Sequence, residues 1–278
     1  MIERLSPAKV NLHLKILRKR EDGYHDLATF MQRISLYDEM IFVPVERGIA
    51  IHCPGNTLPE DHRNIVYRSA QLLISETGWS GGIDIILHKR IPLAAGLGGG
   101  SSNAATTLLV LNEIMGGPLT GTDLMQAGAK LGADVPFFLQ RYPAWAFGIG
   151  YRLEEAPKTP NLFFLLINPG FPLSTKTVYE MLNFALTKEP IHYSIPRFLE
   201  VQEVVKGLHN DLEEVSIKLH PVIGMLKTLL IRHGALGALM TGSGPTVFGI
   251  FNSEEETIRA ENALKEVNGW TLLRAHSI

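Results

Sequence analysis

The chain has 278 residues, of which 45% are hydrophobic and 19% are charged, with a formal net charge of −2. This composition supports a substantial core, excludes wholesale disorder, and gives no electrostatic reason to expect nucleic acid or an anionic membrane as partner. The single cysteine, Cys53, excludes an intrachain disulfide and a cysteine-rich zinc site. Because the sequence shows neither the apolar core of a signal peptide nor a membrane-length apolar stretch, it predicts a cytoplasmic protein.

The first half of the chain predicts a mixed domain of strands and helices. Val10, Leu12 and Leu14 alternate with polar residues over 8–16, and this period of two indicates a half-buried strand with one polar face. The other expected elements are strands at 40–45 and 83–87 and helices at 64–76, 101–115 and 123–131, the last capped by Thr122.

The second half begins after 154–160, a segment with two prolines that we interpret as a domain boundary. We therefore expect one domain over 1–155 and another over 156–278. The order strand, helices, two strands, helix, strand is that of a split βαβ sandwich, so the fold class is α+β. Its expected elements are a strand at 162–167, helices at 177–186 and on both sides of Pro221, strands at 235–240 and 246–251, a helix at 254–267 and a strand at 271–275.

A glycine-rich loop between a predicted strand and a predicted helix is the most informative segment. Glycines let the backbone approach a ligand closely, and the free N–H groups of a helix start favour an anion. The alternative is a flexible turn that ends in an ordinary serine cap. The strand–loop–helix context favours phosphate binding, and a serine hydroxyl here could contact a phosphate-bound magnesium ion. The loop comprises Pro92, Leu93, Ala94, Ala95, Gly96, Leu97, Gly98, Gly99, Gly100, Ser101 and Ser102.

Other nucleotide motifs are excluded directly. A Walker A loop needs a Gly-Lys pair, which the chain lacks, and a Rossmann fingerprint needs glycine where Ser101 stands. Two further segments suit a phosphate or catalytic site. Thr241–Thr246 is a small-residue turn between apolar strands and could equally be a tight hairpin. Asp134 stands beside a proline in an apolar segment, either as a solvated helix-end residue or as a tuned general base.

Three of these segments, in this order, resemble the motifs of the GHMP kinase superfamily: Pro7–Leu12, Pro92–Ser102 and Thr241–Gly249. The resemblance implies a two-domain fold, with an N-terminal domain like ribosomal protein S5 domain 2 and a ferredoxin-like C-terminal domain. Within the superfamily, Asp22–Leu27, Leu131–Phe138 and Asn210–Glu213 resemble a branch that acts in non-mevalonate isoprenoid biosynthesis. That branch phosphorylates the 2-hydroxyl of a small substrate carrying a cytidine diphosphate group.

The resemblance also implies roles for individual residues. Lys9 and Asp134 match the catalytic pair, in which Asp134 takes the proton of the substrate hydroxyl and Lys9 favours the ionised carboxylate. The loop would cradle the phosphates of ATP with Mg²⁺, and Asn64 would help to hold the adenosine. The N-terminal domain would then bind nucleotide and carry catalysis, while the C-terminal domain contributes to the substrate site. No protein metal ligand is predicted.

The cytidine end of the substrate is assigned to Asn11, Tyr24, His25 and Tyr179 by the same resemblance. Without it, Tyr179 could equally be a core residue. Two alternatives stay open: another GHMP kinase, acting on homoserine, a sugar or a mevalonate derivative, and a nucleotide-binding module that has lost catalysis. The sequence makes no prediction of oligomeric state.

Overall fold

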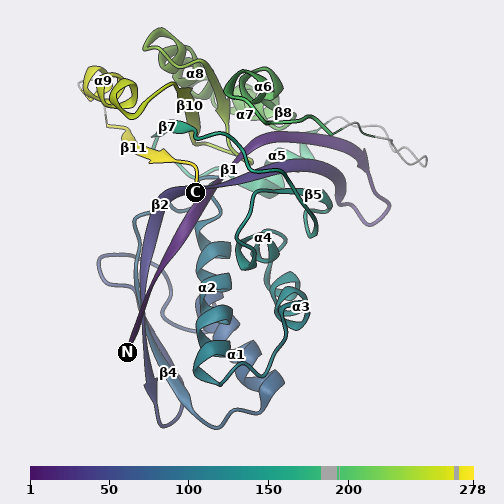
Figure 1. The fold of residues 1–278 in the computed structure, drawn as a ribbon, viewed down its shortest axis with the longest axis vertical. Coiled ribbons are helices and arrows are strands. Elements are labelled where there is room, and N and C mark those ends of the chain that lie inside the picture. Colours follow the sequence, from purple (N-terminus) through teal and green to yellow (C-terminus); the bar gives the residue numbers. More distant parts are fainter. Residues whose placement is uncertain (183–192, 194, 266–268) are drawn as a thin grey trace. The chain divides into compact units, whose positions relative to one another are not determined.

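The chain forms two compact units, each built from several segments. The structure is a computed structural model that describes residues 1–182, 193, 195–265 and 269–278. Two long strands, β1 (Ile2–Lys19) and β2 (His25–Val45), contribute residues to both units (Figure 1). The first unit contains residues 1–8, 37–91 and 98–141, and the second contains 9–36, 92–97 and 142–278. Because neither unit is continuous in sequence, the expected boundary near residue 155 remains a prediction.

The sheet of the first unit is built around β4 (Gly82–His88). β4 pairs antiparallel with the second half of β2, from Glu39 opposite His88 to Val45 opposite Gly82, and parallel with β3 (Ile49–His52). The side chains of β4 alternate, with Ile83, Ile85 and Leu87 fully or almost fully buried. The strand predicted at 83–87 is confirmed as part of β4.

Four helices complete the first unit. α2 (Gly99–Ile114) is largely buried because α1 (Ile65–Thr77), α3 (Gly121–Leu131) and α4 (Val135–Leu139) all pack against it. α3 also packs against α1 and α4. The predicted cap of the third helix is wrong by two residues. Thr120, not Thr122, accepts the N–H of Asp123, and the Asp123 carboxylate accepts the N–H of Thr120 in return. This reciprocal capping box gives a hydrogen-bond partner to the backbone N–H groups of Thr120 and Asp123. Thr122 has no aspartate or glutamate three residues later with which to form such a box.

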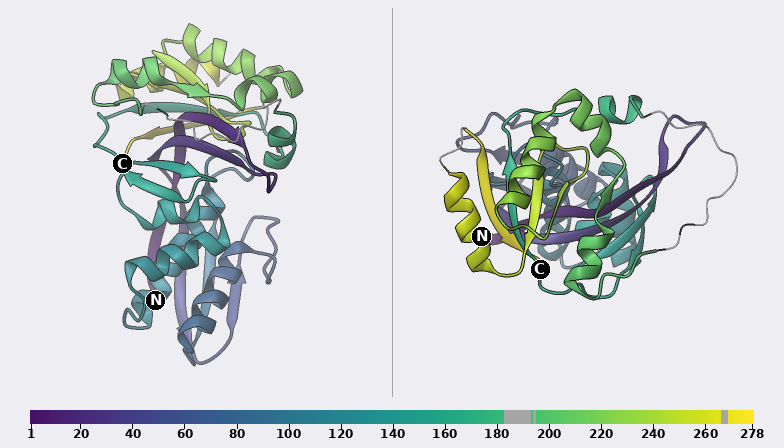
Figure 2. Two further views of the ribbon diagram at one scale, coloured as in Figure 1. Left: turned by 90° about the vertical axis from the view of Figure 1, so that its right-hand side faces the viewer. Right: turned by 90° about the horizontal axis from the view of Figure 1, so that it is seen from above.

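A four-stranded antiparallel sheet of order β11-β7-β10-β9 forms the core of the second unit. Helices α8 (Val222–Arg232) and α9 (Glu254–Leu264) lie on the same face of it (Figures 1 and 2). This topology confirms the predicted split βαβ sandwich. The strands are β7 (Phe163–Asn168), β9 (Gly237–Met240), β10 (Val247–Phe251) and β11 (Thr271–His276).

The rest of the second unit surrounds the β1–β2 hairpin. β5 (Ala144–Gly148) pairs with the first half of β2 and with β6 (Arg152–Glu155), and β8 (His209–Asn210) runs parallel to β1. The predicted helix at 177–186 corresponds to α5 (Thr175–Glu180), and its residues 183–186 lie outside the described residues, as do 266 and 267 of the predicted helix at 254–267. Two further helices are α6 (Val201–Gly207) and α7 (Glu213–Leu219).

The contact between α8 and the four-stranded sheet gives a direct test of the core. Leu226 is fully buried in the cluster that α8 shares with β7 and β10, whereas the neighbouring Met225 is 47% exposed. We expect Leu226→Ala to lower the free energy of unfolding by about 2–5 kcal/mol, because the cavity adds to the lost transfer energy. The matched variant Met225→Ala should change it by less than about 0.5 kcal/mol. Urea unfolding of both variants measures the difference, and equal midpoints would contradict the assignment of this face to the core.

Candidate active site

In the second unit, three motifs that lie far apart in sequence meet at the glycine loop. The N–H of Lys9 on β1 donates to the carbonyl of Leu97, at 2.9 Å. The Thr241 hydroxyl donates to the Gly96 carbonyl at 3.2 Å and accepts the Asn11 N–H at 3.0 Å. Hydrogen bonds therefore join the loop to the first strand and to the turn between β9 and β10.

This close approach requires glycine. Gly96 has a φ of 76°, and a Cβ on it would lie 2.1 Å from the Thr241 carbonyl oxygen. Gly242 has a φ of 57°, and its Cβ would lie 3.2 Å from the Gly96 oxygen. Ala94 adopts a φ of 48°, a region that residues with a side chain seldom occupy and that is typical of strained functional loops. Any side chain at Gly96 would drive the turn away from the loop.

The polar face of β1 carries Lys9 and Asn11, which are both buried. Lys9 Nζ donates to Asn11 Oδ1 at 2.5 Å, and Asn11 Nδ2 donates to the Thr29 hydroxyl at 2.8 Å. Thr29 in turn donates to the His13 carbonyl at 2.7 Å. A charge-assisted bond at the oxygen and a neutral one at the nitrogen fix which way the Asn11 amide points. The structure thus brings together one predicted catalytic residue and one predicted substrate residue.

The motif that starts at Asn210 has a structural role that sequence reasoning did not supply. Asn210 Nδ2 donates to the carbonyls of Met240 and Gly242, at 2.7 and 2.8 Å, so it holds the turn between β9 and β10. Asp211 Oδ2 accepts the N–H of Ile16 on β1, at 2.7 Å. The motif therefore links the first strand to the turn.

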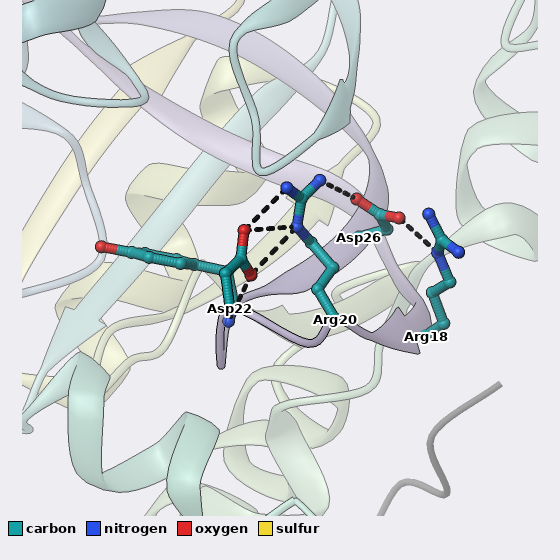
Figure 3. A network of polar contacts seen from close by, with 5 residues as sticks. Arg18, Arg20, Asp22 and Asp26 are labelled. Carbon is teal, nitrogen blue, oxygen red and sulfur yellow. Dashed lines mark hydrogen bonds and ion pairs between the residues drawn. The ribbon is translucent and has the colours of Figure 1, made fainter. Parts of the chain in front are cut away.

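A network of Arg18, Arg20, Asp22 and Asp26 shapes the turn between β1 and β2 (Figure 3). Tyr24, a predicted substrate residue, belongs to this turn. Arg20 binds Asp22 through two nitrogens and Asp26 through a third, and Arg18 Nε donates to Asp26 at 2.5 Å. Asp22 also accepts the N–H of Tyr24 at 3.1 Å. The hydrogen bonds from Arg20 lower the pKa of Asp22. Burial would raise the pKa of Asp26, but the bonds from Arg18 and Arg20 outweigh it and lower that pKa too.

His25 follows this turn and is 6% exposed, whereas Tyr24 is 61% exposed. The His25 ring lies 5.4 Å from the ring of Tyr179 on α5, centroid to centroid and tilted by 42°. Its Nε2 is buried and has no hydrogen-bond partner among the residues that the structure describes. Burial lowers the pKa of His25, and the charge of Lys19 lowers it further. The structure therefore brings two predicted substrate residues together and leaves one buried polar atom for a ligand.

The first unit carries the end of the glycine loop and the predicted base. Gly98 caps α2 with a φ of 70°, and a Cβ on Gly132 would lie 4.0 Å from the Ser101 hydroxyl. Asp134 follows two residues later, is partly buried, and does not use its side chain to cap α4. The packing of α2, α3 and α4 thus brings the segment of the predicted base next to the start of α2, where N–H groups lack intrahelical partners.

Asn64 uses its side chain within the protein. Its Oδ1 accepts the N–H of Val66 at 2.9 Å as the cap of α1, and its Nδ2 donates to the Pro59 carbonyl at 2.8 Å. A capping asparagine of this kind stabilises a helix by about 1 kcal/mol. Its predicted contact with adenosine stays a prediction.

Sequence reasoning missed an ion pair, Asp38 with Lys89, whose two side chains both contact Asn103 near the start of α2. Asp38 on β2 is fully buried, the Lys89 side chain is 4% exposed, and the two are hydrogen bonded. Asp38 is one of several polar residues in β2, and no spacing rule connects it to a lysine 51 residues later.

Within the described ranges, no group of three or more His, Cys, Asp or Glu side chains is arranged to hold a metal ion. In the part of the chain that the structure describes, no helix combines the length and the apolar character needed to cross a bilayer.

The chain matches the family model for the GHMP kinases N terminal domain over residues 64–141 and that for the GHMP kinases C terminal over residues 196–268. Homoserine kinase from Cytophaga hutchinsonii shares the fold, with a TM-score of 0.73 at 18% identity over 99% of this chain and 94% of that one. The fold and these matches define an ATP-dependent kinase of small molecules, of the GHMP class.

Two further comparisons are more specific. The 4-diphosphocytidyl-2-C-methyl-D-erythritol kinase of Syntrophus aciditrophicus (strain SB) is 57% identical over 278 residues, which is 100% of both chains. A crystal structure of 4-(cytidine 5'-diphospho)-2C-methyl-D-erythritol kinase matches with a TM-score of 0.84 at 34% identity, over 100% of both chains. The chain belongs to the 4-diphosphocytidyl-2-C-methyl-D-erythritol kinase family.

The lowered pKa of His25 predicts how the folded chain responds to acid. In the native state His25 should become half-protonated only below pH 6.5, because burial disfavours the imidazolium. The unfolded chain then binds more protons in the window below about pH 6.5, so stability falls as the pH falls through it. Titration of the His25 ring by NMR, native and in urea, measures both midpoints. A native midpoint at or above the urea midpoint would contradict this account.

Proposed function

We propose that this kinase transfers the γ-phosphate of ATP to the 2-hydroxyl of 4-diphosphocytidyl-2-C-methyl-D-erythritol, a step of non-mevalonate isoprenoid biosynthesis. The observation that carries the proposal is the buried His25 ring beside Tyr179, in a chain 57% identical to a kinase of that name over its full length. A neutral imidazole offers one nitrogen as donor and one as acceptor, which suits the polar edge of a cytosine. Tyr179 offers an aromatic face for the same ring.

Asp134 and Lys9 are the proposed catalytic residues. Asp134 accepts the proton of the 2-hydroxyl while that oxygen forms a bond to the γ-phosphorus, and the bond from this phosphorus to the β–γ bridging oxygen breaks to release ADP. The Lys9 ammonium, held by Asn11 in a buried setting, stabilises negative charge that develops on the attacking oxygen. Phosphoryl transfer depends mainly on such positioning and charge stabilisation.

The nucleotide is assigned to the glycine loop and the start of α2, where free N–H groups and the helix dipole favour phosphate oxygens. Mg²⁺ bound with ATP would neutralise charge on the β- and γ-phosphates. Magnesium needs only one or two protein ligands when substrate phosphates and water supply the rest. The hydroxyl of Ser101 at the start of α2 fits this requirement. We assign nucleotide binding and catalysis to residues 1–155 and a contribution to the substrate site to 156–278.

The acceptor is tested by coupled ADP release with magnesium-ATP. We expect turnover with 4-diphosphocytidyl-2-C-methyl-D-erythritol and none above background with homoserine, mevalonate or galactose, because only the first carries the cytidine that His25 and Tyr179 would bind. Turnover with one of the other acceptors alone would show a different GHMP kinase. Binding of ATP without ADP release from any acceptor would instead indicate a module without catalysis.

Removal of the proposed base tests the chemistry separately. Asp134→Asn should lower kcat by about 10²–10⁴-fold, the range typical of a positioned general base, because the amide cannot take the hydroxyl proton. The matched control is Asp123→Asn, where the asparagine side-chain oxygen can still accept the N–H of Thr120 in the capping box of α3, and kcat should stay within about twofold. Steady-state rates at saturating ATP and acceptor measure both. A loss smaller than about a hundredfold for the first variant would rule out Asp134 as the base.

A further inference from the structure

The interior of the first unit holds two charges that the catalytic chemistry does not use. Asp38 is fully buried and the Lys89 side chain is 4% exposed, and their hydrogen bond is charge-assisted. Burial lowers the pKa of Lys89, and the Asp38 charge offsets only part of that shift. Removing two ions from water costs about as much as their attraction returns, so an apolar pair would serve stability equally well. The pair therefore calls for a role in positioning.

The Asp38 carboxylate contacts both ends of the glycine loop. Its Oδ1 accepts the N–H groups of Arg90 and Ile91, at 2.8 and 2.9 Å, and these residues directly precede the loop. Its Oδ2 accepts Nδ2 of Asn103 at 2.9 Å, and Asn103 lies in the first two turns of α2, directly after the loop. One side chain thus fixes the separation between the entry and the exit of the loop.

The neighbours of Asp38 use every polar atom of the Asn103 amide. Lys89 Nζ donates to Asn103 Oδ1 at 3.1 Å, and Asn103 Nδ2 donates to the Ser6 hydroxyl at 2.9 Å as well as to Asp38. The Ser6 hydroxyl in turn donates to the Ser102 hydroxyl at 2.8 Å. Since Asn103 is almost fully buried, a different orientation of the start of α2 would leave several of these groups without partners.

Lys89 also sets how close the helix can lie. A Cβ on Gly99 would lie 3.1 Å from Lys89 Nζ and 2.9 Å from Ile91 Cγ2. The first residue of α2 therefore packs directly on the side chains of Lys89 and Ile91. The network and the glycine together hold the backbone at the position where the helix presents its free N–H groups.

We propose that Asp38 is a positioning residue for ATP: its carboxylate holds the two ends of the glycine loop so that the N–H groups at the start of α2 point at the phosphates. The proposal rests on the proposed function in one respect, the assignment of the ATP phosphates to this loop. A loop that is ordered before binding loses less conformational freedom on binding, and the gain appears as nucleotide affinity.

Three variants test it: Asp38→Asn, Asn103→Asp and the double variant. Asp38→Asn keeps the acceptor for Arg90 and Ile91 but turns an amide toward the Lys89 ammonium. Asn103→Asp places a second carboxylate against Asp38. We expect each single variant to weaken binding of a non-hydrolysable ATP analogue about tenfold or more, the usual effect of losing a hydrogen bond to a charged group. The double variant moves the carboxylate to position 103, within reach of Lys89, and should recover to within about threefold of the parent.

Calorimetry with the analogue gives the affinities, and steady-state kinetics should show a raised KM for ATP with an unchanged KM for the acceptor. A purely structural role would lower the fraction of active enzyme but would leave the KM for ATP and the KM for the acceptor both unchanged. If Asp38→Asn does not fold, the comparison of Asn103→Asp with the double variant carries the test. The proposal is overturned if a folded single variant binds the analogue within twofold of the parent, or if the double variant binds no better than the single ones.

A separate variant distinguishes failure of this proposal from failure of the proposed nucleotide site. A Cβ on Gly100 would meet only Ile65, at 3.9 Å, so the folded protein has room for a side chain there. A large side chain at this position should block the phosphates of the bound nucleotide. Gly100→Leu should abolish binding of the analogue. Unchanged binding by Gly100→Leu would show that the phosphates lie elsewhere, which overturns the proposed nucleotide site and with it the role of Asp38. The calorimetry uses no acceptor, so an error in the acceptor leaves this test intact.

Discussion

The second unit depends on one close backbone contact, the approach of Gly96 to Thr241. A Cβ on Gly96 would lie 2.1 Å from the Thr241 carbonyl, so the contact exists only because the loop has no side chain there. The Thr241 hydroxyl bridges the loop and the first strand through Gly96 and Asn11. Asn210 then fixes the far side of the turn by binding two of its carbonyls. Segments from both ends of the chain are thereby held to one loop.

Burial of polar groups is the second constraint, and it acts differently on different residues. Lys9, Asn11 and Asp38 are buried but bound to several partners, so their orientations are fixed, and Lys89 compensates the charge of Asp38. His25 is buried with Nε2 unpaired among the described residues, and burial keeps its ring neutral near pH 7. Rigid, satisfied groups suit the positioning of phosphates and of a developing charge, while an unsatisfied one suits recognition of a ligand.

Local pattern was enough to predict most of the elements. Period-two alternation located β1, a strand-like run located β4, and the order of elements after residue 160 predicted the split βαβ sheet. Local rules failed where two similar signals compete. Thr120 and Thr122 both suit a helix cap, and only Thr120 has Asp123 at the spacing of a capping box. The β5–β6 hairpin was not predicted, because its strands of five and four residues carry little periodic signal.

The sequence by itself determined the family and the residue types of the site. The chemistry requires particular glycine, lysine and aspartate residues, and these form motifs that can be recognised directly in the sequence. Tertiary structure alone decided which of these residues touch. The contact of Gly96 with Thr241 and of His25 with Tyr179 joins positions more than 140 residues apart, and Asp38 reaches Lys89 and Asn103 across separate elements. Such pairings follow from strand register and helix packing over the whole chain, which no local spacing encodes.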